Sequence, residues 1–98
     1  MEMDLKTALS VCVKTGKTYS GLKETMRALL MGNPKKIIIS KDCKDKDRIE
    51  YYCKISGTDY ATVNLSSLTL GEYCGKPFPI SSLTIINPGD SNILEIKE

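Results

Sequence analysis

Apolar positions along the chain recur with helical spacing in some stretches and with strand-like spacing in others. Spacings of three and four residues predict four helices. The first two cover about residues 4–14 and 22–31. The third begins at a cap, Asp45 or Asp47, and ends at about Ser56, and a brief fourth helix begins at a cap within 64–67 and ends at Cys74. Residues 17–20 form a short strand-like piece, and we expect further strands at 37–39, 59–63 and 83–86 and a short C-terminal element at 93–96. This alternation predicts an α/β fold, a three-layer α/β/α sandwich with a four-stranded mixed sheet.

The stretch from residue 15 to 40 organises this pattern. Its helix carries an apolar stripe with spacings of four and three, which comprises Leu22, Met26, Leu29 and Leu30. The run Gly32-Asn33-Pro34 is expected to end the helix, with Gly32 in a left-handed conformation. The following isoleucines, 37–39, are typical of a strand buried on both faces. Lys23 and Arg27 lie four residues apart and off the stripe, so we expect them to project together into solvent.

Further local signals place the other helix ends. Gly16 and Gly57 are plausible stops for the first and third helices. Asp47 and Glu50 have the spacing of a capping box. The run Asn87-Pro88-Gly89-Asp90 predicts a turn.

The chain is 98 residues long, which is enough for a single domain, and its 41% apolar and 27% charged residues are ordinary for a globular protein. It has no apolar run long enough to span a bilayer, and its first residues do not resemble a signal sequence, so we expect a cytoplasmic protein without membrane contacts. Residues 14–41 hold seven basic side chains and one acid, whereas the remainder holds seven basic and eleven acidic ones. This asymmetry is expected either of a polyanion-binding face or of a lysine-rich solvated surface.

The sequence offers no catalytic or metal-binding constellation. Histidine is absent, and the four cysteines (Cys12, Cys43, Cys53 and Cys74) lack paired ligand spacing. We therefore expect reduced structural thiols and no cofactor. Gly16-Lys17-Thr18 and Gly71 to Lys76 each match only part of a phosphate-binding P-loop. No nucleophile has a base beside it, so we expect the protein not to be an enzyme.

Phe78 is the only phenylalanine, and it lies between Pro77 and Pro79 in a loop without core periodicity. An aromatic ring held on a stiff loop can receive an unstacked base. The alternative is that Phe78 packs against the edge of the core.

From about residue 15 to residue 93 the chain resembles one known family, with five short motifs in the same order and register. They are T-G-K, G-x-K-x-T, I-E-Y-Y, L-G-x-x-C-G-K-x-F and P-G-D-S-x-I. The family is that of the archaeal and eukaryotic large-subunit ribosomal proteins of the thirtieth "e" type, within the kink-turn RNA-binding superfamily. The resemblance implies one RNA-binding domain over residues 1–98 with an α/β/α fold. The partners that it implies are ribosomal RNA, bound at a kink-turn, and neighbouring ribosomal proteins. Free of the ribosome, the protein would be a monomer.

The resemblance also implies where RNA is bound: at the start of the second helix, after the buried strand, and in the loop around Phe78. Arg27 and Lys41 are added because they are basic residues close to these positions in the sequence. The expected RNA-binding residues are therefore Gly21, Lys23, Arg27, Lys41, Asp42, Phe78, Ile80 and Ser81. Relatives usually carry asparagine where Asp42 stands. A carboxylate can accept from a guanine edge but repels phosphate, and Lys41 can offset that repulsion. A kink-turn protein of another ribonucleoprotein and an α/β interaction module without RNA remain the alternatives.

Overall fold

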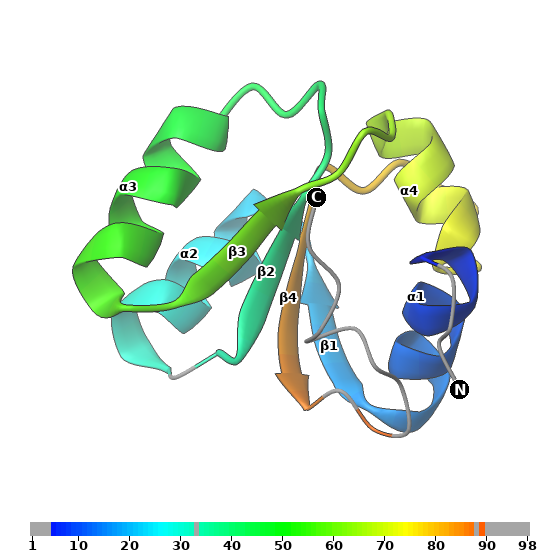
Figure 1. Ribbon diagram of the computed structural model, residues 1–98, viewed down its shortest axis with the longest axis horizontal. Coiled ribbons are helices and arrows are strands. Elements are labelled where there is room, and N and C mark those ends of the chain that lie inside the picture. The colour runs from blue at the N-terminus through cyan, green and yellow to red at the C-terminus, as the bar shows by residue number, and fades with distance from the viewer. Residues whose placement is uncertain (1–4, 33, 88, 90–98) are drawn as a thin grey trace.

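The computed structural model describes residues 5–32, 34–87 and 89 (Figure 1). Helices and strands alternate in the predicted order. They are α1 (Leu5–Thr15), β1 (Lys17–Ser20), α2 (Leu22–Met31), β2 (Lys36–Ile39), α3 (Lys46–Ser56), β3 (Asp59–Thr62), α4 (Ser67–Tyr73) and β4 (Ser82–Asn87). No helix in these ranges has the length and apolar character needed to cross a membrane.

The strands form one mixed sheet in the order β1-β4-β2-β3. The strand β4, last in the chain among these four, pairs antiparallel with β1 on one side and with β2 on the other. Strands β2 and β3 are parallel, with Ile37 opposite Tyr60. The mixed four-stranded sheet predicted from the sequence is therefore confirmed.

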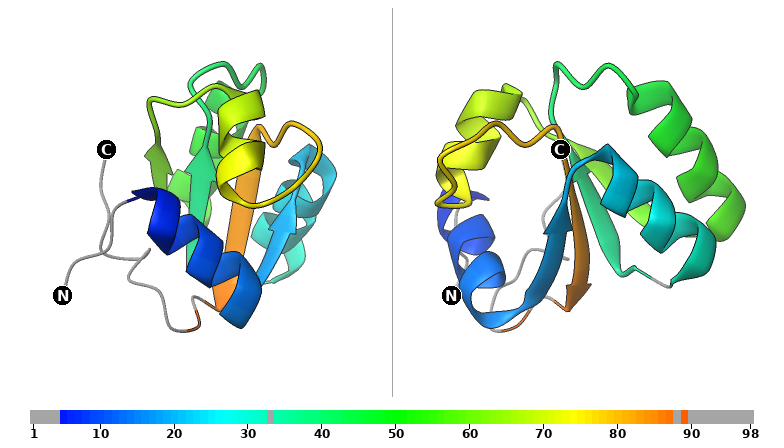
Figure 2. Two further views of the ribbon diagram at one scale, coloured as in Figure 1. Left: turned by 90° about the vertical axis from the view of Figure 1, so that its right-hand side faces the viewer. Right: turned by 180° about the vertical axis from the view of Figure 1, so that it is seen from behind.

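Helices cover both faces of the sheet. Helices α1 and α4 lie on one side, and α2 and α3 lie on the other (Figures 1 and 2). Ile38 packs in one core cluster with Leu9 and Leu70, whereas Ile37 and Ile39 pack in a second cluster on the opposite face. All three isoleucines are fully buried. The two-sided burial predicted for this strand and the three-layer α/β/α arrangement are confirmed.

The apolar stripe of α2 differs from the prediction in one residue. Leu22, Met26 and Leu29 contact the second core cluster, but Leu30 is 65% exposed and Thr25 is fully buried. Because each residue turns a helix by about 100°, Leu30 lies roughly 80° from Leu22, and Thr25 lies about 60° away on the other side. The core therefore contacts a stripe centred between Thr25 and Met26, and assigning Leu30 to it was wrong.

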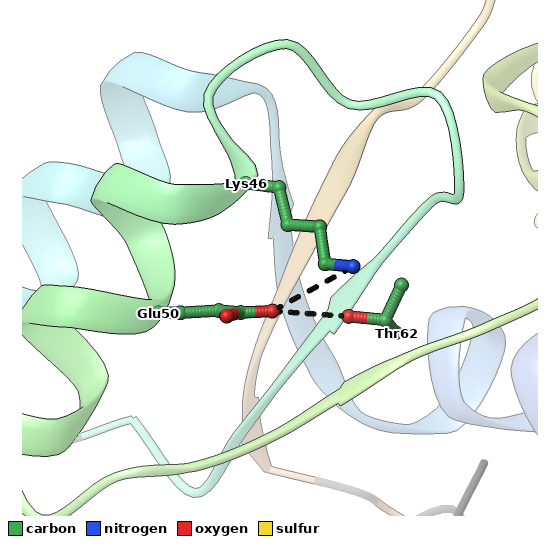
Figure 3. Close-up of polar contacts among 3 residues, drawn as sticks. All are labelled: Lys46, Glu50 and Thr62. Atoms are coloured by element: carbon green, nitrogen blue, oxygen red, sulfur yellow. Dashed lines mark hydrogen bonds and ion pairs between the residues drawn. The ribbon is translucent and has the colours of Figure 1, made fainter.

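Two predicted terminal conformations are also wrong. Helix α2 ends at Met31 as expected, but Gly32 is extended (φ −117°, ψ −165°) rather than left-handed. Asp47 lies inside the first turn of α3, so no capping box forms, and Asp45 occupies the N-cap position without a side-chain hydrogen bond. Glu50 instead lies 3.9 Å from Lys46 Nζ and accepts a long hydrogen bond of 3.5 Å from the hydroxyl of Thr62 on β3 (Figure 3).

Other helix ends follow the sequence. Gly57 is left-handed (φ 72°) and ends α3, and its N–H donates to the carbonyl of Cys53. Ser66, within the predicted cap range, caps α4 by accepting a hydrogen bond from the backbone N–H of Thr69. The predicted C-terminal element at 93–96, and Pro88 and Asp90 of the predicted turn, lie outside the described residues.

Candidate nucleic-acid interface

Four connections meet at one end of the sheet: those that follow β1, β2 and β3, and the loop that leads into β4 (Figures 1 and 2). The N–H of Gly21 donates to the carbonyl of Ser82 at 3.0 Å, and the N–H of Ser40 donates to the carbonyl of Ser81 at 2.9 Å. The N–H of Lys41 donates to the carbonyl of Leu65 at 2.9 Å. Segments far apart in the sequence are thereby held side by side, and they include the predicted residues Gly21, Lys41, Asp42 and Ser81.

The N-terminus of α2 has no capping side chain. Gly21 occupies the N-cap with φ 99° and ψ 158°, a conformation that side chains rarely adopt. Its own N–H is committed to Ser82, so the donors left at this helix end are the backbone N–H groups of residues 22–24. Such uncapped donors and the positive end of the helix dipole favour a bound anion.

Two basic side chains extend from this helix. Lys23 in the first turn and Arg27 one turn later are both exposed, as predicted. Within the described ranges the one ion pair is Lys46–Glu50, so neither Lys23 nor Arg27 is neutralised there. Glu24 is the only acid of α2. The exposed cations therefore add positive charge next to the open N–H groups.

Asp42 is engaged within the protein. Its Oδ1 accepts from the Ser40 hydroxyl at 2.7 Å and from the Ser67 backbone N–H at 2.9 Å, and its Oδ2 accepts from the Ser67 hydroxyl at 3.3 Å. The bond from Ser40 is the main cause that lowers the pKa of this carboxyl below its ordinary value, and the bonds from Ser67 act in the same direction against partial desolvation. Asp42 therefore links the loop after β2 to the start of α4, next to the exposed Lys41.

The loop before β4 presents an aromatic ring and buries an aliphatic side chain. Phe78 is 47% exposed, so about half of its surface is open to a partner, an exposure that packing at the edge of the core also allows. The Phe78 carbonyl oxygen lies where a Cβ on Gly71 would stand, so the loop packs closely on α4. Ile80 is 2% exposed within the first core cluster, and its N–H donates to the Ser67 carbonyl at 2.9 Å. Its side chain thus offers almost no surface to a base in this conformation, contrary to the expected packing. Ser81 is half-buried beside it.

The structure divides the basic stretch that the sequence grouped together. Lys17 begins β1 and pairs with Asn87 at the end of β4, whereas Gly21 is bonded to Ser82 at its beginning. Lys35 donates its N–H to the carbonyl of Ile85, also toward the far end of β4. Lys23 and Lys41 are thus the basic residues of this stretch nearest to the meeting loops. The single basic face expected from residues 14–41 is split between two ends of the sheet.

Sequence reasoning missed the buried hydroxyl groups beneath this site. Thr25, Ser40, Ser82 and Thr84 are fully buried. Thr25 is visible in the G-x-K-x-T motif, but its partners on β4 are not, because nothing local marks a serine or threonine in a strand as the neighbour of a distant helix.

The thiols form no reactive or metal-binding group in the described part of the chain. None of the four cysteines forms a disulfide bond, and Cys12, Cys53 and Cys74 are buried. Burial raises the pKa of Cys53 and of Cys74 to about 11, so both thiols are protonated at neutral pH. Residues 5–32, 34–87 and 89 contain no group of three or more His, Cys, Asp or Glu side chains placed to hold a metal ion.

Known proteins resemble this chain over almost its whole length. The family model described as "Ribosomal protein L7Ae/L30e/S12e/Gadd45 family" matches residues 3–95. The large ribosomal subunit protein eL30 of Methanococcus vannielii is 43% identical over 96 residues, covering 96% of this chain and 91% of the relative. The eL30 protein of Methanosphaera stadtmanae is 43% identical over 98 residues, covering 98% of this chain and 100% of the relative. The eL30 protein of Methanothermobacter thermautotrophicus is 38% identical over 96 residues, covering 96% of this chain and 98% of the relative.

These matches agree with the five motifs read from the sequence and with the observed α/β/α arrangement. The chain belongs to the ribosomal protein L7Ae/L30e/S12e/Gadd45 family.

Proposed function

We propose that this chain is a structural, non-catalytic protein of the large ribosomal subunit that binds a kink-turn, or a similarly bent internal loop, in ribosomal RNA. Its relatives named as large ribosomal subunit proteins eL30 support the ribosomal assignment. The protein then acts on the ribosome in the cytoplasm, as a monomer before assembly, with ribosomal RNA and neighbouring ribosomal proteins as partners.

One observation carries the RNA-binding part. The uncapped N-terminus of α2 is bonded through Gly21 to Ser82, four residues after the exposed ring of Phe78. Open N–H groups and Lys23 suit the phosphates of a sharply bent strand, where negative charge is concentrated. An exposed aromatic ring on the neighbouring loop suits a base that the bend has removed from its stack. Arg27, Lys41 and Ser81 flank these two elements.

Asp42 has a supporting part in this proposal. Both of its oxygens already accept hydrogen bonds from Ser40 and Ser67, and these bonds join two of the loops. A base amino group approaching the carboxylate would share these oxygens. The adjacent Lys41 offsets the repulsion between the carboxylate and nearby phosphate.

The test is a titration of the purified chain with a kink-turn RNA and with an unkinked duplex of the same base composition, at several salt concentrations. We expect preferential binding of the kink-turn, with a slope of log affinity against log salt of about −0.7 to −0.9 per neutralised phosphate. Equal affinity for both RNAs, or an affinity indifferent to salt, would contradict the proposal. Binding confined to kink-turns of another ribonucleoprotein would retain the RNA contact but move the protein out of the ribosome.

A further inference from the structure

The first turn of α2 rests on a chain of buried hydroxyl groups from β4. Thr25, Ser82 and Thr84 are each fully buried. The Thr25 hydroxyl lies 2.9 Å from that of Ser82 and 3.0 Å from that of Thr84. Burying a hydroxyl group is unfavourable unless it is hydrogen-bonded, so three hydroxyls at one helix end must satisfy one another.

The directions of these bonds follow from the donors available. The Thr25 hydroxyl has one hydrogen, and it donates to the carbonyl of Gly21 at 2.8 Å, which can only accept. Thr25 must therefore accept from both neighbours, so Ser82 and Thr84 are the donors. The Thr25 oxygen thus makes one donated and two accepted bonds, which is its full capacity.

Both sides of Gly21 are held by the same pair of residues. Its N–H donates to the Ser82 carbonyl at 3.0 Å, and its carbonyl accepts from the Thr25 N–H at 3.0 Å as well as from the Thr25 hydroxyl. Gly21 has positive φ and no side chain to contact its surroundings. These bonds therefore act with the packing of Leu22 against the second core cluster to fix how the helix end is oriented on the sheet.

We propose that Thr25 and Ser82 are positioning residues for RNA recognition. Their hydroxyls fix the first turn of α2 against β4, so that the open N–H groups and Lys23 keep one orientation relative to the loop that carries Phe78. Ser82 serves both elements, because it binds Gly21 and Thr25 and continues directly from that loop. This inference rests on the proposed RNA binding, in which neither hydroxyl touches RNA.

The test uses Thr25→Val, which keeps the shape and removes the hydroxyl, Thr25→Ser, which restores it, and Ser82→Ala. The control is Cys53→Ala, which loosens the core under α3 without touching this network. All four are titrated with kink-turn RNA at a temperature where each is folded. Exchange of the Gly21 and Thr25 amide hydrogens is measured without RNA.

We expect Thr25→Val and Ser82→Ala to bind kink-turn RNA about tenfold more weakly than wild type, the size of effect expected when a buried hydrogen bond is lost. The salt slope should stay unchanged because no cation is removed, and Thr25→Ser should recover most of the affinity. Exchange of the two amides should accelerate in Thr25→Val but not in Cys53→Ala.

The inference is overturned if Thr25→Val binds as tightly as wild type, or loses no more affinity than Cys53→Ala. A wild-type protein without preference for the kink-turn would instead overturn the proposed function. If the wild type shows no such preference, amide exchange decides the positioning role. Unchanged exchange in Thr25→Val would overturn that role, and faster exchange would show that the hydroxyls position the end of α2 without a part in RNA binding.

Discussion

The carboxylate of Asp42 accepts a hydrogen bond from the backbone N–H of Ser67 at 2.9 Å, across 25 residues of sequence. This bond joins the loop after β2 to the first residue of α4. The carbonyl of Ser67 in turn accepts the N–H of Ile80, so the same residue also holds the loop before β4. One acidic side chain and one helix start thus connect two of the loops of the proposed interface.

Acid should weaken this connection. The pKa of Asp42 lies below its ordinary value of 3.8, chiefly because of the bond from Ser40. A carboxyl group whose pKa is lower in the folded state stabilises the fold above the unfolded pKa, and that contribution is lost as pH falls through the folded pKa. We expect the difference in Tm between wild type and Asp42→Asn to hold at neutral pH and to shrink as pH falls below about 4, through the folded pKa of Asp42.

Thermal unfolding across this pH range measures the difference. Asp59→Asn, which changes an exposed carboxylate without a hydrogen-bond partner in the described part of the chain, is the control. A difference between wild type and Asp42→Asn that stays constant down to pH 2 would count against the assignment of these bonds to an ionised Asp42.

Removing Lys23 tests the phosphate contact at the α2 N-terminus. Because the ammonium group is exposed and outside any ion pair in the described ranges, Lys23→Ala should leave stability nearly unchanged. We expect weaker binding to every RNA and a salt slope reduced by about one unit. Lys54→Ala on α3 is the matched control, and titrations at several salt concentrations separate the two. Equal slopes for both variants would place the phosphate contact elsewhere.

Removing the Phe78 ring tests the base platform. Phe78→Ala should cost about 1–3 kcal/mol of binding free energy to kink-turn RNA, because stacking is lost, while the salt slope stays unchanged. Tyr51→Ala removes an aromatic ring that is 61% exposed on α3 and serves as the control. Isothermal titration measures both, and wild-type affinity in Phe78→Ala would exclude the ring from the interface.

Gly71 tests how the aromatic loop is held. A Cβ at residue 71 would collide with the carbonyl of Phe78, which is backbone and cannot rotate away. We expect Gly71→Ala to lower the free energy of unfolding by about 1–3 kcal/mol and to weaken RNA binding by displacing the loop. Gly57→Ala, with a left-handed φ of 72° but open space around it, should cost about 1 kcal/mol and leave RNA binding intact. Denaturant unfolding and RNA titration check both, and a harmless Gly71→Ala would contradict the close packing.

Local patterns predicted most of the fold. The bounds of α2 and β1 agree with the structure residue for residue, because a helix stop and a glycine separate segments with clear periodicity. The errors at Leu30, Gly32 and Asp47 are of one kind. At each of these positions the local sequence allows two outcomes: inward or outward for Leu30, left-handed or extended for Gly32, and cap or first turn for Asp47. Contacts with the rest of the molecule select one of them, and periodicity alone does not.

The candidate site was predicted less completely. Exposure of Lys23 and Arg27 agrees with the prediction from sequence, since cations have no place in a periodic core. For Phe78 the sequence left two alternatives, a platform for a base and packing against the edge of the core. The engagement of Asp42 by serines and the burial of Ile80 were not predicted. The bonds of Asp42 depend on the loop after β2 meeting the start of α4, whereas the burial of Ile80 depends on the loop before β4 packing on the same helix. No local pattern records either contact.

By itself the sequence determined the order of helices and strands, the two-sided core strand and the family, because these follow from residue types and spacings within short segments. The tertiary structure alone decided which basic residues share one end of the sheet and which hydroxyl groups support the α2 N-terminus. The physical reason for the hydroxyl contacts is the sheet order: by placing β4 between β1 and β2, it brings together Thr25 and Ser82, which are 57 residues apart. The extended strand β1 holds Lys17 and Gly21 at its opposite ends.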